Sequence, residues 1–516
     1  MFAPVSPTSP GRQPGIRQNP YTRLLHRFYE PLILLEALGK TRAPPDRPDV
    51  LLDSRSRRRR IQDNLAYLCD TEKGGTTTSA TGFELTAAGI TLWIASNGAA
   101  AQKNCDFLRG VFSAVRRIMR FQDQEKTLAE DRFINEAILF AKPRVRKETT
   151  LLCKSINEME RFLGKGNDVK LLLHWLDKFS ELDNLEVPLF AYDRRHADEL
   201  QDLERRMDQA ANETGLEDPK TAFAKFRHCL GRLACHVRAP KQLLEDLAIL
   251  PHLSLVQNVQ QVDPGLPPVV PEMDSKTTIE GIVTRMLPAQ SPMLPEHLES
   301  LRHLDTRYNI LERVKDAYQN GLKPRVHAEI QILEHFYQKG LTFVDRDPYI
   351  GCSKPACFCC LLYFRHHPGT WVTPRSHHKI WLQWGLPGLA PPASGAFDKQ
   401  DPQYRHQLEI LNKMNADIRK ETLEQIRWRA APTDWHPDSV TGITSEFNRM
   451  RSDLGSTEDM ESVSTGDAYG ELYTPGTTPQ QSQSRTMSES QLPDMRSSSA
   501  EPSMSEDSDT EGGVPL

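Results

Sequence analysis

Residues 326–360, VHAEIQILEHFYQKGLTFVDRDPYIGCSKPACFCC, decide how this chain is interpreted. They hold His327 and Glu329 in H-x-E spacing, followed by Cys357 and Cys360 in C-x-x-C spacing. One imidazole and two thiolates occupy three corners of a tetrahedral zinc site and leave the fourth corner for water. Zinc lowers the pKa of such a water, and a nearby carboxylate can move its protons. The pattern predicts a hydrolytic site with His327, Cys357 and Cys360 as zinc ligands and Glu329 as the proton carrier.

Both motifs are predicted to open helices. From His327 onward, apolar residues recur at helical spacing, and residues 355–364 predict a second helix that starts at the cysteines. A short strand is expected between them, within residues 341–352. Two helix N-termini that meet at one metal favour thiolates, because the positive end of each helix dipole stabilises negative charge. The apolar positions of the first helix are Ile330, Leu333, Phe336 and Tyr337.

Neither motif is specific by itself, and alternatives remain. C-x-x-C pairs also occur in thiol redox proteins and in structural zinc sites. Both motifs in this order, with 27 residues between Glu329 and Cys357, favour catalytic zinc. The main alternative is a non-catalytic protein-interaction scaffold that keeps zinc to stabilise its fold, although such a site does not need Glu329. A redox pair of Cys357 and Cys360 leaves His327 and Glu329 unexplained.

The H-A-E motif at His327, the I-G-C-S-K stretch at 350–354 and the pair Cys357 and Cys360 resemble the OTT-like deaminase family. This family is a largely fungal branch of the cytidine and nucleic-acid deaminase superfamily. The resemblance covers roughly residues 300–390. It implies a three-layer α/β/α fold, one zinc ion and hydrolytic removal of an amino group from a nucleobase. The implied substrate is a nucleobase-containing compound, which is a nucleotide, RNA or DNA.

Two features depart from the pattern of that superfamily. Proline usually precedes the first cysteine directly, whereas Ala356 separates Pro355 from Cys357 here. The fold also needs a β-hairpin before the H-A-E helix, but residues 294–320 predict one or two helices. The missing strands are expected either from residues 277–286 or from a region far upstream.

Several residues around the cysteines are candidates for binding substrate. A Ser-Lys pair precedes the C-x-x-C motif, and cations alternate with tryptophans after it, a mixture that can stack a base and hold a phosphate. An equally supported interpretation is that the tryptophans cover the sheet while the charges form a surface loop. Residues 370–373 are expected to be a strand. The candidates are Ser353, Lys354, Trp371, Arg375, His377 and His378.

Composition divides the rest of the chain. Apolar residues at helical spacing predict an all-helical N-terminal domain, with one helix over the apolar run 83–96. Seven prolines in 262–295 favour a linker. The expected architecture is α/β: a three-layer α/β/α cytidine-deaminase-like module, added to the helical domain and a disordered tail. Its parts are 1–20 disordered, 21–255 helical, 256–295 proline-rich linker, 296–400 zinc deaminase-like module, 401–430 amphipathic helix packed on the module, and 431–516 disordered acidic tail rich in Ser, Thr and Pro.

The tail is acidic and the body is mildly basic. From Ser452 onward there are 13 Asp or Glu and two Arg, a net charge of −11, against −5 for the whole chain. The residues before Ser452 therefore sum to about +6, which permits a nucleic-acid substrate without requiring one. A segment this poor in apolar residues does not fold alone. Protein partners, if any, are expected to bind the N-terminal helices and the acidic tail.

Cysteine usage and hydropathy indicate an intracellular protein. Nine cysteines without a secretory signal favour a reducing compartment, either cytoplasm or nucleus. No membrane partner is expected, because polar residues interrupt the most apolar run, 83–101. The basic run 55–60 (RSRRRR) fits a nuclear import signal, a nucleic-acid contact or a solvated helix face. The glycine loop 74–78 lacks the Lys-Ser/Thr pair that completes a phosphate loop, so it is expected to be a flexible loop.

Overall fold

The computed structural model describes residues 20–46, 53–98, 101–164, 166–265, 270–320, 322–389 and 398–429. The segments expected to be disordered, 1–20 and 431–516, lie outside these ranges, except that helix α1 (Pro20–Leu38) begins at Pro20. No helix among the described residues is both long enough and apolar enough to cross a bilayer.

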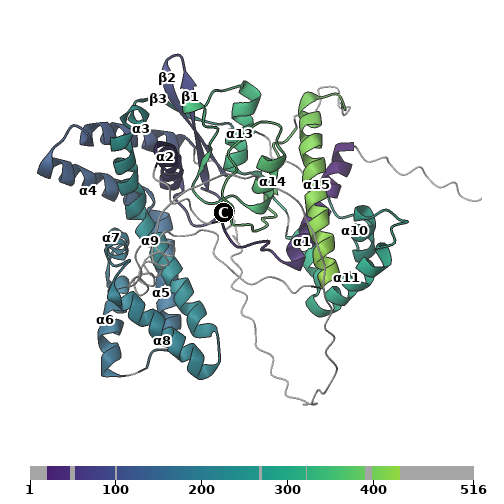
Figure 1. The fold of residues 1–516 in the computed structure, drawn as a ribbon, viewed down its shortest axis with the longest axis horizontal. Helices are drawn as coiled ribbons and strands as arrows, with labels where there is room; N and C mark the ends of the chain where they lie inside the picture. The colour runs from purple at the N-terminus through teal and green to yellow at the C-terminus, as the bar shows by residue number, and fades with distance from the viewer. Residues whose placement is uncertain are drawn as a thin grey trace, which may run out of the picture. The chain divides into compact units, whose positions relative to one another are not determined.

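Within the described residues, a four-stranded mixed sheet brings together three distant parts of the chain (Figure 1). Its strand order is β3-β2-β1-β5. β1 pairs antiparallel with both β2 and β5, whereas β3 pairs parallel with β2. A separate parallel pair joins β4 to β6. The strands are β1 (Ser79–Thr86), β2 (Gly89–Ser96), β3 (Val256–Gln261), β4 (Arg325–Val326), β5 (Gly351–Cys352) and β6 (Trp384–Gly385).

The β1–β2 hairpin corrects two expectations. The prediction of one helix over residues 83–96 is wrong, and so is the expectation of an all-helical N-terminal domain. Gly89, with a φ of 123°, allows the reversal between the strands. Beyond it, Leu92 and Ile94 face one side of the sheet and Trp93 faces the other. Both faces are covered, so apolar residues occupy both and hide the two-residue period of a strand.

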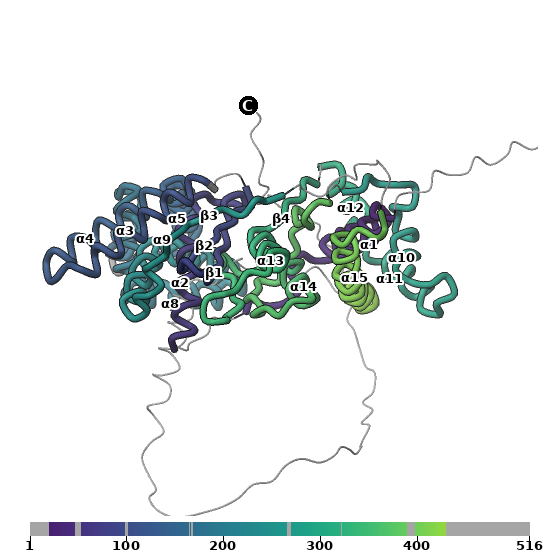
Figure 2. Tube along the Cα trace, turned by 90° about the horizontal axis from the view of Figure 1, so that it is seen from above, coloured from purple at the N-terminus to yellow at the C-terminus, as the bar shows by residue number. Residues whose placement is uncertain are grey.

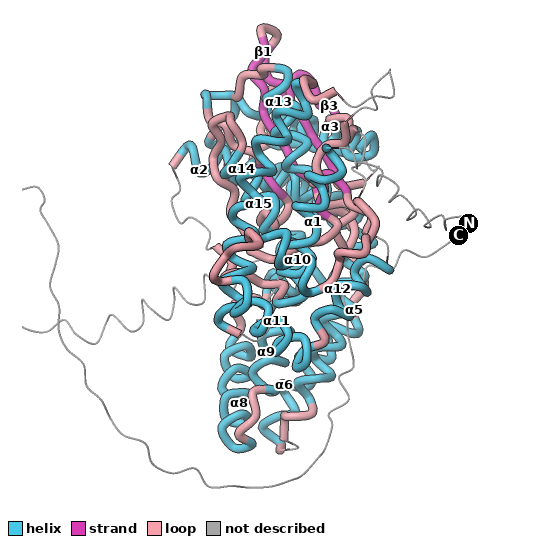
Figure 3. Tube along the Cα trace, turned by 90° about the vertical axis from the view of Figure 1, so that its right-hand side faces the viewer, coloured by secondary structure: helices cyan, strands magenta, loops and turns pink. Residues whose placement is uncertain are grey.

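Helices cover both faces of this sheet. On one face α13 (Ala328–Lys339) packs against β1 and β2, and Figure 3 shows it crossing in front of the strands. On the other face α2 (Ser54–Cys69) contacts β1 and β5, while α3 (Ala101–Ile118) contacts β2 and β3. The helix that begins at the H-A-E motif is therefore supported by a hairpin more than two hundred residues upstream.

Two glycines permit close packing around the motifs. A Cβ on Gly82 of β1 would lie 2.9 Å from the Phe336 ring of α13. A Cβ on Gly351 of β5 would lie 2.4 Å from the Cβ of Gln62 on α2. Real side chains do not tolerate such distances, so glycine lets α13 and β5 approach their neighbours. The close packing sets the distance between the two motif segments.

A helical bundle lies between β2 and β3 in the sequence. Its apolar core includes Trp175, Phe179 and Phe226, which meet edge to face. Its longest helix, α9, also packs against α2, so the bundle reaches the segment that supports β5. Besides α3, the bundle helices are α4 (Asp123–Phe140), α5 (Lys142–Glu160), α6 (Asn167–Glu181), α7 (Glu186–Asp193), α8 (Asp198–Thr214) and α9 (Asp218–Ile249).

The remaining helices pack around the motif segment and share its core with α1. α1 contacts α15, and Figure 2 shows α13, α14 and α15 following one another away from the sheet. The proline-rich segment 256–295 contributes β3 and α10, so the missing hairpin comes from upstream and not from 277–286. Residues 294–320 form two helices, within the range predicted. The bounds are α10 (Ile279–Met286), α11 (Leu294–Tyr308), α12 (Ile310–Gln319), α14 (Phe358–His366) and α15 (Pro402–Trp428).

Candidate metal centre

His327, Cys357 and Cys360 meet at the N-termini of two helices. His327 is the residue before α13, and Cys357 is the residue before α14. The Nδ1 atom of His327 lies 3.6 Å from Sγ of Cys357 and 3.4 Å from Sγ of Cys360. Residues that are thirty positions apart in the sequence therefore meet in one cluster, and its donor atoms all lie within 4.8 Å of one another.

The spacing of these donors fits zinc. Zinc–sulfur bonds of about 2.3 Å and zinc–nitrogen bonds of about 2.0–2.1 Å, at tetrahedral angles, place sulfur and nitrogen about 3.6 Å apart. The observed distances from His327 Nδ1 to the two sulfurs, 3.6 Å and 3.4 Å, agree with this value. The donor set, one imidazole with two thiols, is also one that zinc prefers.

The thiol of Cys357 is prepared to ionise. Burial alone raises its pKa, but a hydrogen bond from Cys360 and the interaction with His327 outweigh burial and lower the pKa to about 6. Because Cys357 caps the N-terminus of α14, the positive end of that helix also favours a thiolate there. The cluster therefore offers a metal an ionised ligand near neutral pH.

Trp384 completes the surroundings of the cluster. Its indole N–H donates to Sγ of Cys360 over 3.1 Å, and its ring is fully buried. Tyr29 of α1 donates to the carbonyl of Trp384, and the Phe28 ring lies 5.4 Å from the indole. An N–H donor to a coordinating sulfur orients that sulfur and tunes its basicity. The sequence offers no signal for this role, since the tryptophans of this region look alike.

Glu329 lies beside the cluster without being one of its three members. Glu329 is buried, with only 5% of its surface exposed to solvent. Burial raises the pKa of the Cys360 thiol, and the neighbouring Cys357 and the Glu329 carboxylate raise it further. The Glu329 carboxylate therefore lies within hydrogen-bonding reach of a thiol of the cluster.

The upstream hairpin fixes the first turn of α13. The backbone N–H of Ala328 donates to Oδ1 of Asn97 over 2.7 Å, directly after β2. The side-chain amide of Asn97 in turn donates to the carbonyl of Gly75. Gln331 donates to the carbonyl of Ser96 over 3.1 Å. Asn97 thus satisfies a free N–H at the helix start, which no sequence neighbour of His327 does.

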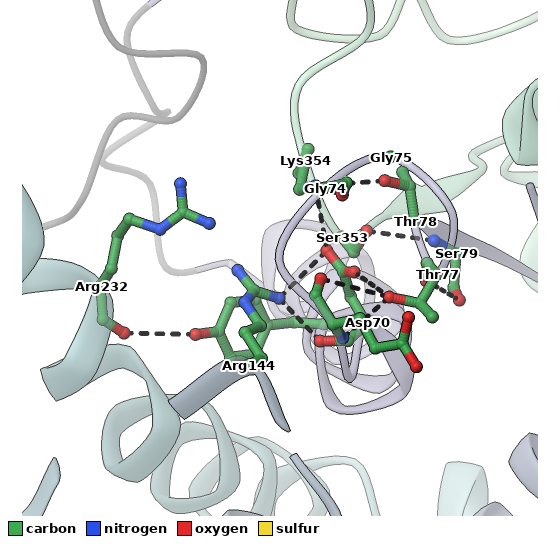
Figure 4. A network of polar contacts seen from close by, with 12 residues as sticks. Asp70, Gly74, Gly75, Thr77, Thr78, Ser79, Arg144, Arg232, Ser353 and Lys354 are labelled. Atoms are coloured by element: carbon green, nitrogen blue, oxygen red, sulfur yellow. Dashed lines mark hydrogen bonds and ion pairs between the residues drawn. The ribbon is translucent and has the colours of Figure 1, made fainter. Parts of the chain in front are cut away.

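Ser353 and Lys354 hold the glycine loop 74–78 (Figure 4). Ser353 exchanges hydrogen bonds with the backbone of Ser79: its N–H donates to the Ser79 carbonyl, and its hydroxyl accepts from the Ser79 N–H. The ammonium of Lys354 donates to the carbonyl of Gly74 over 2.8 Å and to the hydroxyl of Thr78 over 3.2 Å. Residues 74–78 form neither helix nor strand, and the contacts of Lys354 fix this loop from the cysteine side.

The other predicted substrate residues lie apart from one another. Arg375 approaches Asp63 at 3.5 Å and lines the same cavity as Ser353 and Lys354. Trp371 instead donates its indole N–H to His367 over 2.8 Å. The structure therefore brings Ser353, Lys354 and Arg375 together and separates Trp371 from them. The prediction of a strand over residues 370–373 is wrong. These residues lie in a loop, where the backbone N–H of Val372 donates to the carbonyl of Pro348.

The two adjacent histidines of the predicted set fix a loop. His377 is buried and accepts the N–H of Lys379. His378 adopts a φ of 54° and pairs with Asp46 at 3.0 Å. The pairing with Asp46 holds this loop against the segment that follows α1. It also offsets the cost of the left-handed backbone at His378.

The basic run on α2 forms internal ion pairs. Arg58 and Arg59 donate to Asp347, which follows the short turn after α13. Arg60 donates twice to Asp246 on α9. These contacts tie the bundle to the segment between the two motifs. They favour a structural role over the nuclear-import and nucleic-acid interpretations.

A second group of metal-type side chains, found among the described residues, is Glu334, His367 and His406. Glu334 of α13 lies 3.3 Å from His367 and 3.1 Å from His406 of α15, and Tyr363 of α14 donates a short hydrogen bond to it. Its partners therefore come from both helices packed beyond α13.

Comparison with known families agrees with this geometry. Residues 326–388 match the family model described as OTT_1508-like deaminase, and the match spans all three cluster residues and Glu329. This segment is therefore similar to that deaminase family, in agreement with the resemblance of its motifs. No curated protein and no solved structure matched the chain.

Proposed function

We propose that this protein is a zinc-dependent hydrolytic deaminase that acts on a nucleobase, in a nucleotide or in a nucleic acid. The observation that carries the proposal is the near-tetrahedral spacing of His327, Cys357 and Cys360, with the buried carboxylate of Glu329 beside them. A site that only stabilised the fold would not need a buried acid at that place. The deaminase-family match over residues 326–388 supports the same chemistry.

His327, Cys357 and Cys360 would hold the zinc, and Trp384 would orient the Cys360 sulfur. When bound, zinc supplies Lewis acidity, which makes water a competent nucleophile near neutral pH. Glu329 would accept a proton from the water as the water oxygen bonds to the amine-bearing carbon of the base, and would deliver that proton to the exocyclic nitrogen. The carbon–nitrogen bond would then break, ammonia would leave, and the water oxygen would remain on the base.

The layered arrangement around the site supports a cytidine-deaminase-like module. α13 covers one face of the sheet, α2 and α3 cover the other, and the hairpin that this fold needs is β1–β2. We infer that the bundle α4–α9 is an insertion between the second strand of the hairpin and the H-A-E helix. The nine free cysteines support a reducing compartment, cytoplasmic or nuclear.

Ammonia release across a panel of nucleosides, nucleotides, single-stranded DNA and RNA tests the proposal. Wild-type protein with zinc bound should deaminate at least one member. Glu329→Gln should keep its zinc and lose about 10²-fold to 10⁴-fold in rate, because an amide does not relay a proton. Glu312→Gln, at an exposed position of α12, is the matched control and should keep full activity.

Two outcomes would contradict the proposal. One is an undiminished rate in Glu329→Gln, which removes the role of that carboxylate. The other is zinc-loaded wild type that deaminates no member of the panel, which favours the non-catalytic scaffold.

A further inference from the structure

A cavity of about 160 Å³ lies beside the metal centre, between α2, α5, α9 and the loop 350–355. Its wall carries cations from three separate parts of the chain. Local sequence patterns do not predict this cavity, because the helical bundle, far from the motifs in sequence, supplies half of its charged side chains. The charged side chains that line it are Asp63, Arg144, Arg232, Arg238, Lys354 and Arg375.

Positive charge exceeds negative charge around this cavity. Five cations line it, and four carboxylates interact with them: Asp63 in the wall, Asp70 and Glu148 beside the buried arginines, and Asp46 beside Arg375. Burial raises the pKa of Glu148, but Arg232 and Arg144 outweigh burial and hold it well below its usual range. Burial raises the pKa of Asp63, while Arg375 acts to lower it.

The cations are held in place before any ligand arrives. Arg144 donates to the carbonyl of Asp70 over 2.8 Å and to Glu148 over 3.0 Å, and it stacks on the Tyr67 ring. Arg232 donates to the same Glu148 over 2.8 Å. Figure 4 shows Arg144 and Lys354 converging on Asp70. Fixed donors bind an anion without the entropy cost of ordering long side chains.

Two arginines are placed to contact a ligand directly. Arg375 has a side chain 41% exposed and lies 3.5 Å from Asp63, so its guanidinium reaches the cavity mouth. It is also close to Asp46, which acts on it from the solvent side. Arg238 donates to Sγ of Cys235, a weak acceptor that a phosphate oxygen can replace.

The cavity adjoins the reacting site. Cys352, Lys354 and Pro355 line it, and Pro355 lies two residues before Cys357 of the metal cluster. Burial raises the pKa of the Cys352 thiol, and the Glu329 carboxylate and Asp63 raise it further. The cavity is therefore close enough to Glu329 for that carboxylate and Asp63 of the cavity wall to act on the same thiol.

We propose that this cavity binds the terminal phosphate monoester of the substrate, so that a nucleotide is preferred over the nucleoside. A monoester carries a charge of about −1.5 to −2 at neutral pH, more than the single charge that each phosphate of a continuous backbone presents to these cations. Arginine forks match phosphate oxygens in pairs. The inference rests on the proposed function, because it names the substrate class of the same site.

Phosphate binding tests the cavity without any deamination assay. Inorganic phosphate should raise the Tm of zinc-loaded wild type, with chloride at equal ionic strength as the reference. The double variant Arg238→Gln/Arg375→Gln should keep its zinc and bind phosphate at least about tenfold more weakly, since each arginine donates charge-assisted hydrogen bonds. Arg427→Gln, an exposed arginine at the end of α15, is the matched control and should bind as wild type does.

Two further arms identify the source of the phosphate. Nucleoside 5′-monophosphates should bind more tightly than nucleosides, and only in protein that has both arginines. A short single-stranded oligonucleotide with a terminal phosphate should bind more tightly than the same strand without it. Equal binding of the two strands would overturn the monoester assignment in favour of backbone contacts.

Other results separate this inference from the proposed function. If phosphate binds equally to wild type and to the double variant, the anion is bound elsewhere, for instance at the metal, and the cavity assignment is wrong. If deamination is observed but ignores the terminal phosphate, the function stands and the inference fails. If the panel shows no deamination while phosphate binding depends on both arginines, the phosphate site stands and the proposed function fails.

Discussion

One cluster of possible metal ligands in the described part of the chain is His327, Cys357 and Cys360, and another is Glu334, His367 and His406. Both satisfy the same limit, with donor atoms within 4.8 Å. Both also draw residues from α13 and from the region of α14, so they are neighbours on one pair of helices. Their hydrogen bonds, however, differ.

In the second cluster the hydrogen bonds disfavour a metal. Nδ1 of His367 accepts from the N–H of Gly369 over 3.0 Å and from the indole N–H of Trp371 over 2.8 Å. A neutral imidazole that accepts at Nδ1 carries its proton on Nε2, which lies 3.3 Å from Glu334. A metal would need that Nε2 lone pair. In the first cluster the Trp384 indole donates to the Cys360 sulfur, and a thiolate has further lone pairs with which to bind a metal.

Donor spacing therefore identifies candidate metal sites, and the other hydrogen-bond partners of each donor atom decide between these candidates. His327 shares its Nδ1 with two thiols, whose protons a metal displaces. Glu334 instead accepts from Tyr363 and from two imidazoles, so its oxygens are already satisfied. The second cluster joins α13, α14 and α15 through its hydrogen bonds.

Substituting members of each cluster should break the comparison most clearly. His327→Ala, Cys357→Ser and Cys360→Ser should each abolish stoichiometric zinc, because three ligands define the site. His406→Ala in the second cluster should keep about one zinc per chain. Elemental analysis of freshly purified protein measures both. Zinc lost from His406→Ala but retained in the first three variants would reverse our assignment.

Removing the donor to Cys360 should have a smaller effect. Trp384→Phe keeps the ring but removes the N–H, and we expect zinc affinity to fall by about 10- to 100-fold, as for other partners of metal ligands. Chelator competition measures the affinity. Trp381→Phe is the matched control, because its ring contacts Lys40 rather than a ligand. Equal affinities in the two variants would show that the indole only fills space.

Removing the central acid of the second cluster should lower stability and leave zinc in place. Burial raises the pKa of Glu334, but hydrogen bonds from His367, His406 and Tyr363 outweigh burial and lower it well below the usual range. Its contribution is therefore complete above the unfolded pKa of about 4.3 and is lost as the pH falls further. At pH 7, Glu334→Gln should cost about 2 kcal/mol in the free energy of unfolding.

Denaturant unfolding of wild type and Glu334→Gln at matched pH values measures this difference. The gap between the two proteins should be constant from pH 7 to 5 and should shrink below about pH 4.3. A gap that does not change with pH would indicate a neutral carboxyl. Loss of zinc from this variant would instead make the second cluster part of the metal centre.

Local patterns predicted the helices well and the sheet poorly. The helix that begins after His327 and the helix that begins after Cys357 appear where the apolar spacing predicted them. The prediction of a helix over residues 83–96 is wrong because both faces of the hairpin are buried, so its apolar residues show no clear two-residue period. The basic run 55–60 does not predict that Arg58 and Arg60 form ion pairs with carboxylates nearly two hundred or more residues downstream, since such pairing depends on tertiary contacts.

The sequence by itself determined which side chains can meet at the centre. H-x-E and C-x-x-C supply one imidazole, one carboxylate and two thiols at helical spacing, because residue type and helical spacing are local properties. Only the tertiary structure decided what supports that centre and what lies beside it. Asn97 caps α13, Trp384 donates to a ligand, and Arg144 and Arg232 turn toward the loop of Lys354. Those residues are far apart in the chain, and packing of the bundle against the sheet alone brings their side chains to one place.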